Sequence, residues 1–227
     1  MSQEKVSCII PAYNEEKRIG GVLKAVSNHP LIDEIIAVDD GSQDNTKEVI
    51  KKFKNVRLII HKKNKGNTQT LIDGITASKN KILLFVDSDL INLDKKQLAD
   101  LILPVKENNA DVSIALITSM SWLWNIVGID YLCGQRVMRK GLIKDYKKIK
   151  NIPSYGLNVS FFNKHIIQDK LRLKIVKWNK VYAPFPSEKM EFWEGNKRFF
   201  KMMKQIVGLT GFFGWIYQIY AMKKLQV

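Results

Sequence analysis

Lys81-Ile-Leu-Leu-Phe-Val-Asp-Ser-Asp89 is a continuous apolar run that ends in two carboxylates separated by one residue. Five consecutive apolar residues, Ile82 to Val86, are typical of a central strand that is covered on both faces. Open α/β sheets bind ligands at the carboxyl ends of their strands. We therefore expect Asp87 and Asp89 to lie at that edge of a sheet and to hold a metal ion.

The same design recurs upstream. Glu34-Ile-Ile-Ala-Val-Asp-Asp-Gly-Ser42 is another apolar strand that ends in acids and a turn, and Val6-Ser-Cys-Ile-Ile10 runs into the polar segment Pro11-Ala-Tyr-Asn-Glu15. Carboxylate oxygens suit Mg²⁺ or Mn²⁺, and a carboxylate pair leaves the other octahedral positions to phosphate oxygens and water. A nucleoside diphosphate is the simplest ligand for such an edge.

Strands alternate with helices through the first half of the chain, which predicts an α/β fold with a doubly wound, mostly parallel sheet and flanking helices. Asp44 or Asn45 is expected to cap a helix that ends near Phe53. Pro104 is expected to kink or interrupt a helix from about Asp94 to Asn108. The alternation fades after the last of the expected strands, which are Val6–Ile10, Glu34–Val38, Val56–Ile60, Ile82–Val86 and Asp111–Ile117.

Cysteine usage and the N-terminus indicate a reducing, cytoplasmic setting. Cys8 and Cys133 are the only cysteines in the 227 residues, and they give neither a disulfide framework nor a zinc-binding spacing. The segment Met1-Ser-Gln-Glu-Lys5 leads directly into the first expected strand without an apolar signal region.

The basic charge lies entirely in the C-terminal part of the chain. Residues 1–134 hold 17 basic and 17 acidic side chains, whereas residues 135–227 hold 20 and 5, which gives the whole net charge of +15. Such asymmetry suits an anionic partner, namely a membrane surface, a phosphorylated acceptor or nucleic acid. A basic face that is simply solvated is the plain alternative.

Four motifs in residues 10–90 occur in an order and spacing typical of one enzyme family. They are Ile10-Pro-Ala-Tyr-Asn-Glu-Glu16, Val38-Asp-Asp-Gly-Ser-Gln-Asp-Asn-Thr46, Asn64-Lys-Gly66 with Asp73-Gly-Ile75, and Phe85-Val-Asp-Ser-Asp-Leu90. In these motifs the chain resembles the GT-A glycosyltransferases of the family 2 type. Further along, Cys133-Gly-Gln-Arg-Val-Met-Arg139 and Tyr155-Gly-Leu-Asn-Val159 resemble looser versions of patterns in the polyprenyl-phosphate sugar synthases.

The resemblance implies a GT-A, Rossmann-like fold and assigns roles in nucleotide binding. Asp40 resembles the family acid that meets the base or ribose of the nucleotide, and Pro11, Tyr13 and Glu15 would form the rest of that pocket. By itself the Asp-Asp-Gly-Ser sequence is also an ordinary turn, because Asp caps and Gly adopts positive φ.

The resemblance also assigns the metal and the phosphates. Asp89 is expected to coordinate Mg²⁺ or Mn²⁺ directly, while Asp87 contacts the ribose or shares the metal, with Ser88 between them in the motif. Lys65 is expected to contact a donor phosphate, with a solvated lysine as the alternative.

The acceptor side is short of candidate general bases. Asp130 is the only acid from Val112 through Lys144, and that segment has no histidine. Transfer to a hydroxyl needs such a base, whereas a phosphate acceptor is already anionic at neutral pH. Arg136 would hold the acceptor phosphate or the donor diphosphate, with Arg139 beside it on a predicted helix.

Two basic residues further on, in Gly195-Asn-Lys-Arg198, complete the expected set of cations. Lys197 and Arg198 resemble the basic loop that closes over the diphosphate in the polyprenyl-phosphate enzymes.

The chain is expected to divide into three parts. Residues 1–117 form the nucleotide-sugar-binding half, residues 118–200 the acceptor-side half of the same GT-A domain, and residues 201–227 a basic, aromatic helix. Within this last part, residues 206–222 hold several aromatic residues and are flanked by lysines. We consider three interpretations for it, a helix at a membrane interface, a core helix and a membrane span, of which the first fits the aromatic residues best.

These inferences predict a metal-dependent glycosyltransferase that moves a sugar from a nucleoside diphosphate to an anionic acceptor. A polyprenyl phosphate at the cytoplasmic face of a membrane is the favoured acceptor. The enzymatic alternative acts in solution on a small phosphorylated acid or a saccharide hydroxyl. A nucleotidyltransferase is disfavoured because Pro11-Ala-Tyr-Asn-Glu15 is not a glycine-rich basic loop. A nucleic-acid-binding module would leave Asp40, Asp87 and Asp89 unexplained, so no nucleic acid is expected as partner.

Overall fold

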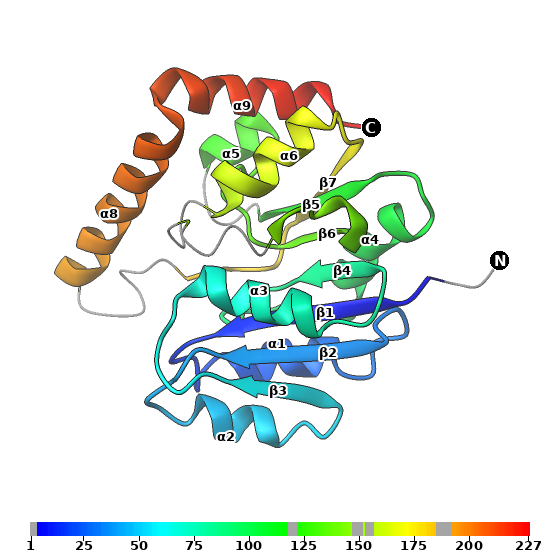
Figure 1. Cartoon of the computed structure of the whole chain (residues 1–227), viewed down its shortest axis with the longest axis vertical. Coiled ribbons are helices and arrows are strands. Elements are labelled where there is room, and N and C mark those ends of the chain that lie inside the picture. Colours follow the sequence, from blue (N-terminus) through cyan, green and yellow to red (C-terminus); the bar gives the residue numbers. More distant parts are fainter. Residues whose placement is uncertain (1–3, 118–121, 147–151, 153–156, 185–191) are drawn as a thin grey trace.

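The computed structural model describes residues 4–117, 122–146, 152, 157–184 and 192–227. Its centre is a seven-stranded sheet in the order β3-β2-β1-β4-β6-β5-β7 (Figure 1). Neighbouring strands are parallel except at β6, which runs antiparallel to both β4 and β5. The strands are β1 Val6–Ala12, β2 Glu34–Asp39, β3 Val56–Ile60, β4 Ile82–Phe85, β5 Val112–Ile117, β6 Arg136–Arg139 and β7 Leu173–Trp178.

Helices cover both faces of this sheet (Figure 1). α3 lies in front of β1 in Figure 1 and packs against it. α1 packs against α2 and α4. The helices are α1 Ile19–Val26, α2 Thr46–Lys51, α3 Asn67–Ala77, α4 Lys95–Lys106, α5 Trp122–Val127, α6 Asn163–Gln168, α8 Phe192–Thr210 and α9 Phe212–Lys224, with a π-helical turn η4 at Asn158–Phe162 and a 3-10 turn η1 at Lys140–Leu142.

The predicted doubly wound, mostly parallel sheet is confirmed. All five expected strands are present, and their ends differ from the prediction by at most two residues. The apolar runs of β1 and β4 are buried along their length, as expected for central strands. Gly74 of α3 lies so close to Ile9 of β1 that a Cβ at this position would overlap the isoleucine side chain, which fixes how near this helix approaches the sheet.

The predicted helix around Arg139 was wrong. Arg136–Arg139 is strand β6, and it pairs residue by residue with β4, from Phe85 opposite Arg136 to Ile82 opposite Arg139. The segment has only two apolar residues between two arginines, so its own sequence does not indicate a strand. The pairing with β4 on one side and β5 on the other supplies the stabilisation.

The predicted helix at Asp94–Asn108 is α4, and it begins with a capping box. The Asp94 carboxylate accepts the Gln97 N–H at 2.9 Å, and the Gln97 side chain accepts the Asp94 N–H at 2.9 Å. Of the two effects expected at Pro104, a kink or an interruption, the interruption was wrong, because the helix continues through this residue to Lys106. Pro104 lies in the last turn, where few following residues remain to be displaced.

The single C-terminal helix expected at residues 201–227 is two helices. α8 ends at Thr210 and α9 begins at Phe212, because Gly211 adopts a φ of 68° that breaks the helical run. α9 packs against α6, and α8 continues past the side of the sheet toward which the arrowheads of β1 to β4 point (Figure 1). Within the described ranges, no helix combines the length and apolar character needed to cross a membrane.

Candidate active site

The loops that follow β1 and β2 are joined by hydrogen bonds at the carboxyl edge of the sheet. Asn14, with a φ of 55°, donates its N–H to the Ser42 hydroxyl at 3.0 Å. Its side-chain oxygen accepts the Gln43 N–H at 2.9 Å. The Thr46 hydroxyl accepts the N–H of Glu15 at 2.7 Å. These bonds bring the two loops of the predicted nucleotide pocket together.

The three residues predicted for the β1 side of that pocket differ in exposure. Pro11 is half-buried and Tyr13 is 39% exposed, so a ligand can reach both. Glu15 is buried, and its carboxylate accepts a hydrogen bond from Nε of Arg18 at 2.7 Å. Glu15 therefore holds the loop in shape.

Asp40, at the end of β2, is buried and accepts hydrogen bonds from three donors. Oδ1 accepts from Nδ1 of His61 at 2.6 Å and from the Lys65 N–H at 2.9 Å, while Oδ2 accepts from the Gly66 N–H at 2.8 Å. The carboxylate thus orders the loop in front of α3. Lys65 contributes its backbone to this network, and its side chain is exposed.

Asp87 and Asp89 follow β4 and are half-buried, whereas Ser88 between them is buried. Oδ2 of Asp87 accepts a hydrogen bond from Nε2 of Gln135 at 2.5 Å. A Cβ on Gly134 would lie 2.9 Å from the same oxygen, so only glycine lets the chain pass this carboxylate closely. Gly134 and Gln135 belong to the segment Cys133–Arg139, and nothing in that segment indicates from sequence that they contact Asp87.

A small cavity of about 130 Å³ lies at this edge of the sheet. Its polar lining includes Asp87 and Asn158. Pro11 of β1 and Ile206 of α8 also line it. The predicted first loop, the metal motif and the second half of the chain therefore meet at one cavity. Apart from Asp87 and Pro11, the lining was not predicted; it comprises Asn67, Leu71, Phe85, Val86, Leu132, Gly134, Asn158, Phe162 and Ile206.

Arg136 lies behind the wall of this cavity and is 1% exposed. Its Nη2 donates to the Cys133 carbonyl at 2.5 Å and to Oδ1 of Asn158 at 3.0 Å, and the guanidinium lies 4.6 Å from the centre of the Phe162 ring. Nε and Nη1 have no hydrogen-bond partner in the described part of the chain. Burial lowers the pKa of Arg136 to about 10, so the side chain remains cationic at neutral pH.

Asp130 is the buried acid nearest in sequence to this arginine. One of its oxygens accepts the Leu132 N–H at 3.1 Å. Burial raises the pKa of Asp130 to about 6, although the backbone hydrogen bonds and the charge of Arg136 act in the opposite direction. Asp130 is only 4% exposed, so its carboxylate is poorly placed to take a proton from an acceptor.

Arg139 and Lys197 lie outside this cluster. Arg139 is at the opposite end of β6 from Arg136, because an antiparallel strand places them beside Ile82 and Phe85 respectively. It forms an ion pair with Glu4 and donates to the Val105 carbonyl, so the expected action beside Arg136 does not fit the strand. Lys197 is exposed on α8, and the side chain of its neighbour Arg198 lies outside the described residues.

The carboxylates after β4 fit a hard divalent cation. Asp87 and Asp89 present oxygen donors, as Mg²⁺ and Mn²⁺ require. Among the residues that the structure places, no group of three or more His, Cys, Asp and Glu side chains gathers to hold a metal by itself. A metal bound by the pair would therefore take its remaining ligands from phosphate oxygens and water.

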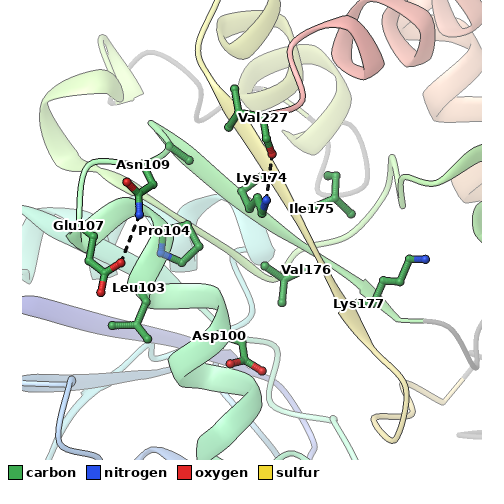
Figure 2. Close-up of a pocket in the computed structure, with 11 residues that line it drawn as sticks. Asp100, Leu103, Pro104, Glu107, Asn109, Lys174, Ile175, Val176, Lys177 and Val227 are labelled. Atoms are coloured by element: carbon green, nitrogen blue, oxygen red, sulfur yellow. Dashed lines mark hydrogen bonds between the residues drawn. The ribbon is translucent and has the colours of Figure 1, made fainter.

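A second hollow, of about 670 Å³, lies between α4 and the edge strand β7 (Figure 2). It is larger than the cavity at Asp87 but lies away from the predicted site residues. Asp100, Glu107, Lys174 and Lys177 are its charged lining, and Lys174 donates to the Val227 carbonyl at 3.0 Å (Figure 2). None of the predicted site residues lines it, so the smaller cavity is the candidate active site.

The fold matches a solved enzyme. Glucosyl-3-phosphoglycerate synthase from Mycobacterium tuberculosis, in complex with Mn²⁺, UDP and glucosyl-3-phosphoglycerate, gives a TM-score of 0.69 at 19% identity, over 91% of this chain and 81% of that one. The same synthase has also been solved with Mg²⁺ and UDP. This likeness confirms the predicted GT-A architecture.

Sequence relatives extend the comparison. An uncharacterised protein of Methanocaldococcus jannaschii is 30% identical over 161 residues, which are 70% of this chain and 57% of the relative. Dodecaprenyl-phosphate galacturonate synthase of Rhizobium johnstonii is 28% identical over 171 residues, which are 63% of this chain and 50% of the relative. The chain spans about half the length of the curated relatives it matches. The family model described as glycosyl transferase family 2 matches residues 7–175.

Proposed function

Because the chain belongs to glycosyl transferase family 2, we propose that it transfers a sugar from a nucleoside diphosphate to a polyprenyl phosphate in a metal-dependent reaction. The observation that carries this proposal is the cavity at Asp87. Asp87 and Ile206 of α8 both line it, and the same helix continues into residues with exposed apolar side chains.

Asp87 and Asp89 would hold the metal, with Asp89 as the direct ligand. A bound Mg²⁺ or Mn²⁺ would neutralise the diphosphate leaving group. Pro11 and Tyr13 are accessible on the first loop and would line the nucleotide side, next to the loop that Asp40 orders. Lys65, exposed in that loop, would contact a donor phosphate, and Lys197, exposed on α8, would be a further cation.

The acceptor side favours a phosphate nucleophile. Asp130, the one acid between Val112 and Lys144, is buried and hydrogen-bonded, so it does not offer a base to an acceptor hydroxyl. A phosphate acceptor is already anionic and attacks the anomeric carbon without proton transfer. Arg136, a cation fixed behind the cavity wall, would stabilise the negative charge that gathers there.

The exposed face of α9 suits a membrane surface. Phe213, Ile216, Tyr217 and Tyr220 lie at helical spacing and are 84%, 49%, 62% and 56% exposed, while Met222 on the other side is buried. Lysines follow at the end of the helix. Aromatic and aliphatic side chains next to cations are typical of helices that lie in the headgroup region. We propose that this face places the cavity near a lipid acceptor at the cytoplasmic side of a membrane.

A second candidate acceptor is a small phosphorylated acid. The solved enzyme that shares this fold over 91% of the chain was crystallised with glucosyl-3-phosphoglycerate. Both candidates present a phosphate to the site, but only the lipid would use the exposed face of α9.

The test is to incubate the protein with Mn²⁺ or Mg²⁺ and a panel of radiolabelled nucleotide sugars, with and without a short polyprenyl phosphate. Label that enters the organic phase only with metal and lipid would support the proposal and name the donor sugar. If label instead enters only a water-soluble product, and only when 3-phosphoglycerate is supplied, the small phosphorylated acid would replace the lipid as the proposed acceptor. Asp89→Asn is the control, and full turnover by this variant would contradict the metal role.

A further inference from the structure

His61 is a buried titratable side chain that the proposed reaction does not use. It follows β3 at the carboxyl edge of the sheet and is 4% exposed. Its N–H donates to the Asp39 carbonyl at 2.9 Å, which extends the pairing of β3 with β2 by one residue. The position brings the imidazole between the turn after β2 and the side of α3.

Both ring nitrogens of His61 face carboxylates. Nδ1 lies 2.6 Å from Oδ1 of Asp40, and Nε2 lies 2.8 Å from Oδ2 of Asp73. The imidazole therefore links the turn after β2 to α3 through both of its ring nitrogens.

The other hydrogen bonds of Asp40 connect His61 and the turn after β2 to the loop at residues 62–66. The carboxylate accepts the N–H groups of Lys65 and Gly66, the two residues before α3. Gly66 has a φ of 89° at the N-cap position, a conformation that suits glycine. The loop also passes close to Gly41, where a Cβ would lie 2.8 Å from the Lys63 carbonyl carbon.

α3 connects these hydrogen bonds of His61 to the cavity. Asn67 and Leu71 of this helix are part of the cavity lining with Asp87. Asp73, two residues after Leu71, accepts from Nε2 of Gln69 at 2.8 Å on one oxygen and faces Nε2 of His61 with the other. The ring thus sets where the first turns of α3 lie with respect to the cavity.

We propose that His61 is a positioning residue for the donor nucleotide, because its hydrogen bonds to Asp40 and Asp73 hold residues 62–66 and the start of α3 in the shape that receives the nucleoside diphosphate. This inference rests on the proposed function. It adds a residue that neither the family motifs quoted above nor the metal pair includes.

The test compares two buried histidines in the full-length chain. His29 is also 4% exposed and makes two hydrogen bonds, to the Lys95 carbonyl at 2.9 Å and from the Leu31 N–H at 3.2 Å, but it lies in the turn before β2, far along that strand from Asp40. His61→Asn and His29→Asn would be measured for thermal unfolding and for binding of UDP with Mn²⁺ by calorimetry. We expect about tenfold weaker UDP binding for His61→Asn and none of this loss for His29→Asn.

Asp73 provides a second pair of variants that leave Asp40 intact. Its side chain is 30% exposed, so the fold should tolerate both changes. Asp73→Asn keeps an acceptor for Nε2 and should bind UDP within about twofold of the unchanged chain, whereas Asp73→Ala should follow His61→Asn. With an active donor, the KM for that donor should rise while kcat and the acceptor KM hold.

Three results would overturn the inference: wild-type UDP binding by His61→Asn, an equal loss in His29→Asn, or equal effects of the two Asp73 variants. Failure of the proposed function is distinguishable, because the unchanged chain itself would then bind neither UDP nor another nucleoside diphosphate with Mn²⁺. That result would remove the nucleotide role of His61 as well.

Discussion

Gln135 donates a hydrogen bond from Nε2 to Oδ2 of Asp87 at 2.5 Å. The glutamine is 2% exposed, and its amide oxygen accepts the Cys133 thiol at 2.8 Å. Because β6 pairs with β4, the residues just before β6 lie beside the residues just after β4. The second half of the chain therefore fixes Asp87, the first carboxylate of the predicted metal pair.

Gly134→Ala should weaken metal-dependent nucleotide binding while the fold persists. The new Cβ would lie 2.9 Å and 3.0 Å from the Asp87 oxygens, so the carboxylate must turn or shift. We expect binding of UDP with Mn²⁺ to fall at least about tenfold in calorimetry.

Gly141→Ala is the matched control for that change, because nothing lies within 4 Å of a Cβ at Gly141. Thermal unfolding of both variants would show that they fold. Unchanged UDP binding by a folded Gly134→Ala protein would contradict the proposed role of Asp87.

The two arginines of β6 should respond differently to the same substitution. Arg136→Met should lower turnover by about 100-fold, because the cavity loses the cation behind its wall. The unfolding free energy should change little, since a buried guanidinium with unpaired nitrogens is replaced by an apolar chain. Arg139→Met, at the opposite end of the strand, should keep turnover within about twofold. Equal losses of turnover in the two variants would contradict the role assigned to Arg136.

The sequence was sufficient for the strands that carry continuous apolar runs. β1, β2 and β4 contain enough consecutive apolar residues to be recognised without knowledge of their neighbours. β6 does not, because Arg136-Val-Met-Arg139 becomes a strand through its pairing with β4 and β5. The error about Arg139 followed directly from this, since a helix would have placed both arginines on one side.

The site was predictable where a motif ends a strand and was missed where partners come from distant segments. Asp87 and Asp89 follow a clear strand, so their place at the sheet edge could be inferred. His61 resembles a solvated loop residue in the sequence, and its partners Asp40 and Asp73 lie 21 and 12 residues away. The break at Gly211 was missed because a single glycine within an apolar run does not reveal its φ.

Asp130 should make stability fall as the pH rises. Its folded-state pKa of about 6 is above the ordinary value of 3.8, so the folded state binds the proton more tightly than the unfolded chain. The stabilisation is complete below pH 3.8 and is lost as the pH rises to 6, a difference of about 3 kcal/mol. Urea unfolding from pH 4 to 7 should show this loss in the unchanged chain and its absence in Asp130→Asn.

Asp111 gives a control of opposite sign for the pH series. The hydrogen bond from Arg172 holds the pKa of Asp111 below its usual range, so its contribution is present at neutral pH and is lost on acidification. Asp111→Asn should therefore lose stability relative to the unchanged chain as the pH rises. Parallel pH profiles for the unchanged chain and Asp130→Asn would contradict the burial of an ionisable Asp130.

The exposed face of α9 should control binding to lipid vesicles. Phe213→Ser with Ile216→Ser removes two of its most apolar exposed side chains without touching the buried Met222. Burial of a phenylalanine or isoleucine side chain is worth about 1.5–3 kcal/mol, so vesicle affinity should fall at least about tenfold. The control is Ile60→Ser, an exposed position on the edge strand β3, which should leave vesicle binding unchanged. Sedimentation with vesicles of neutral and anionic lipid would measure both variants. If the double variant sediments like the unchanged chain, the lipid surface lies elsewhere, and if the unchanged chain stays in the supernatant, the small phosphorylated acceptor becomes the better proposal.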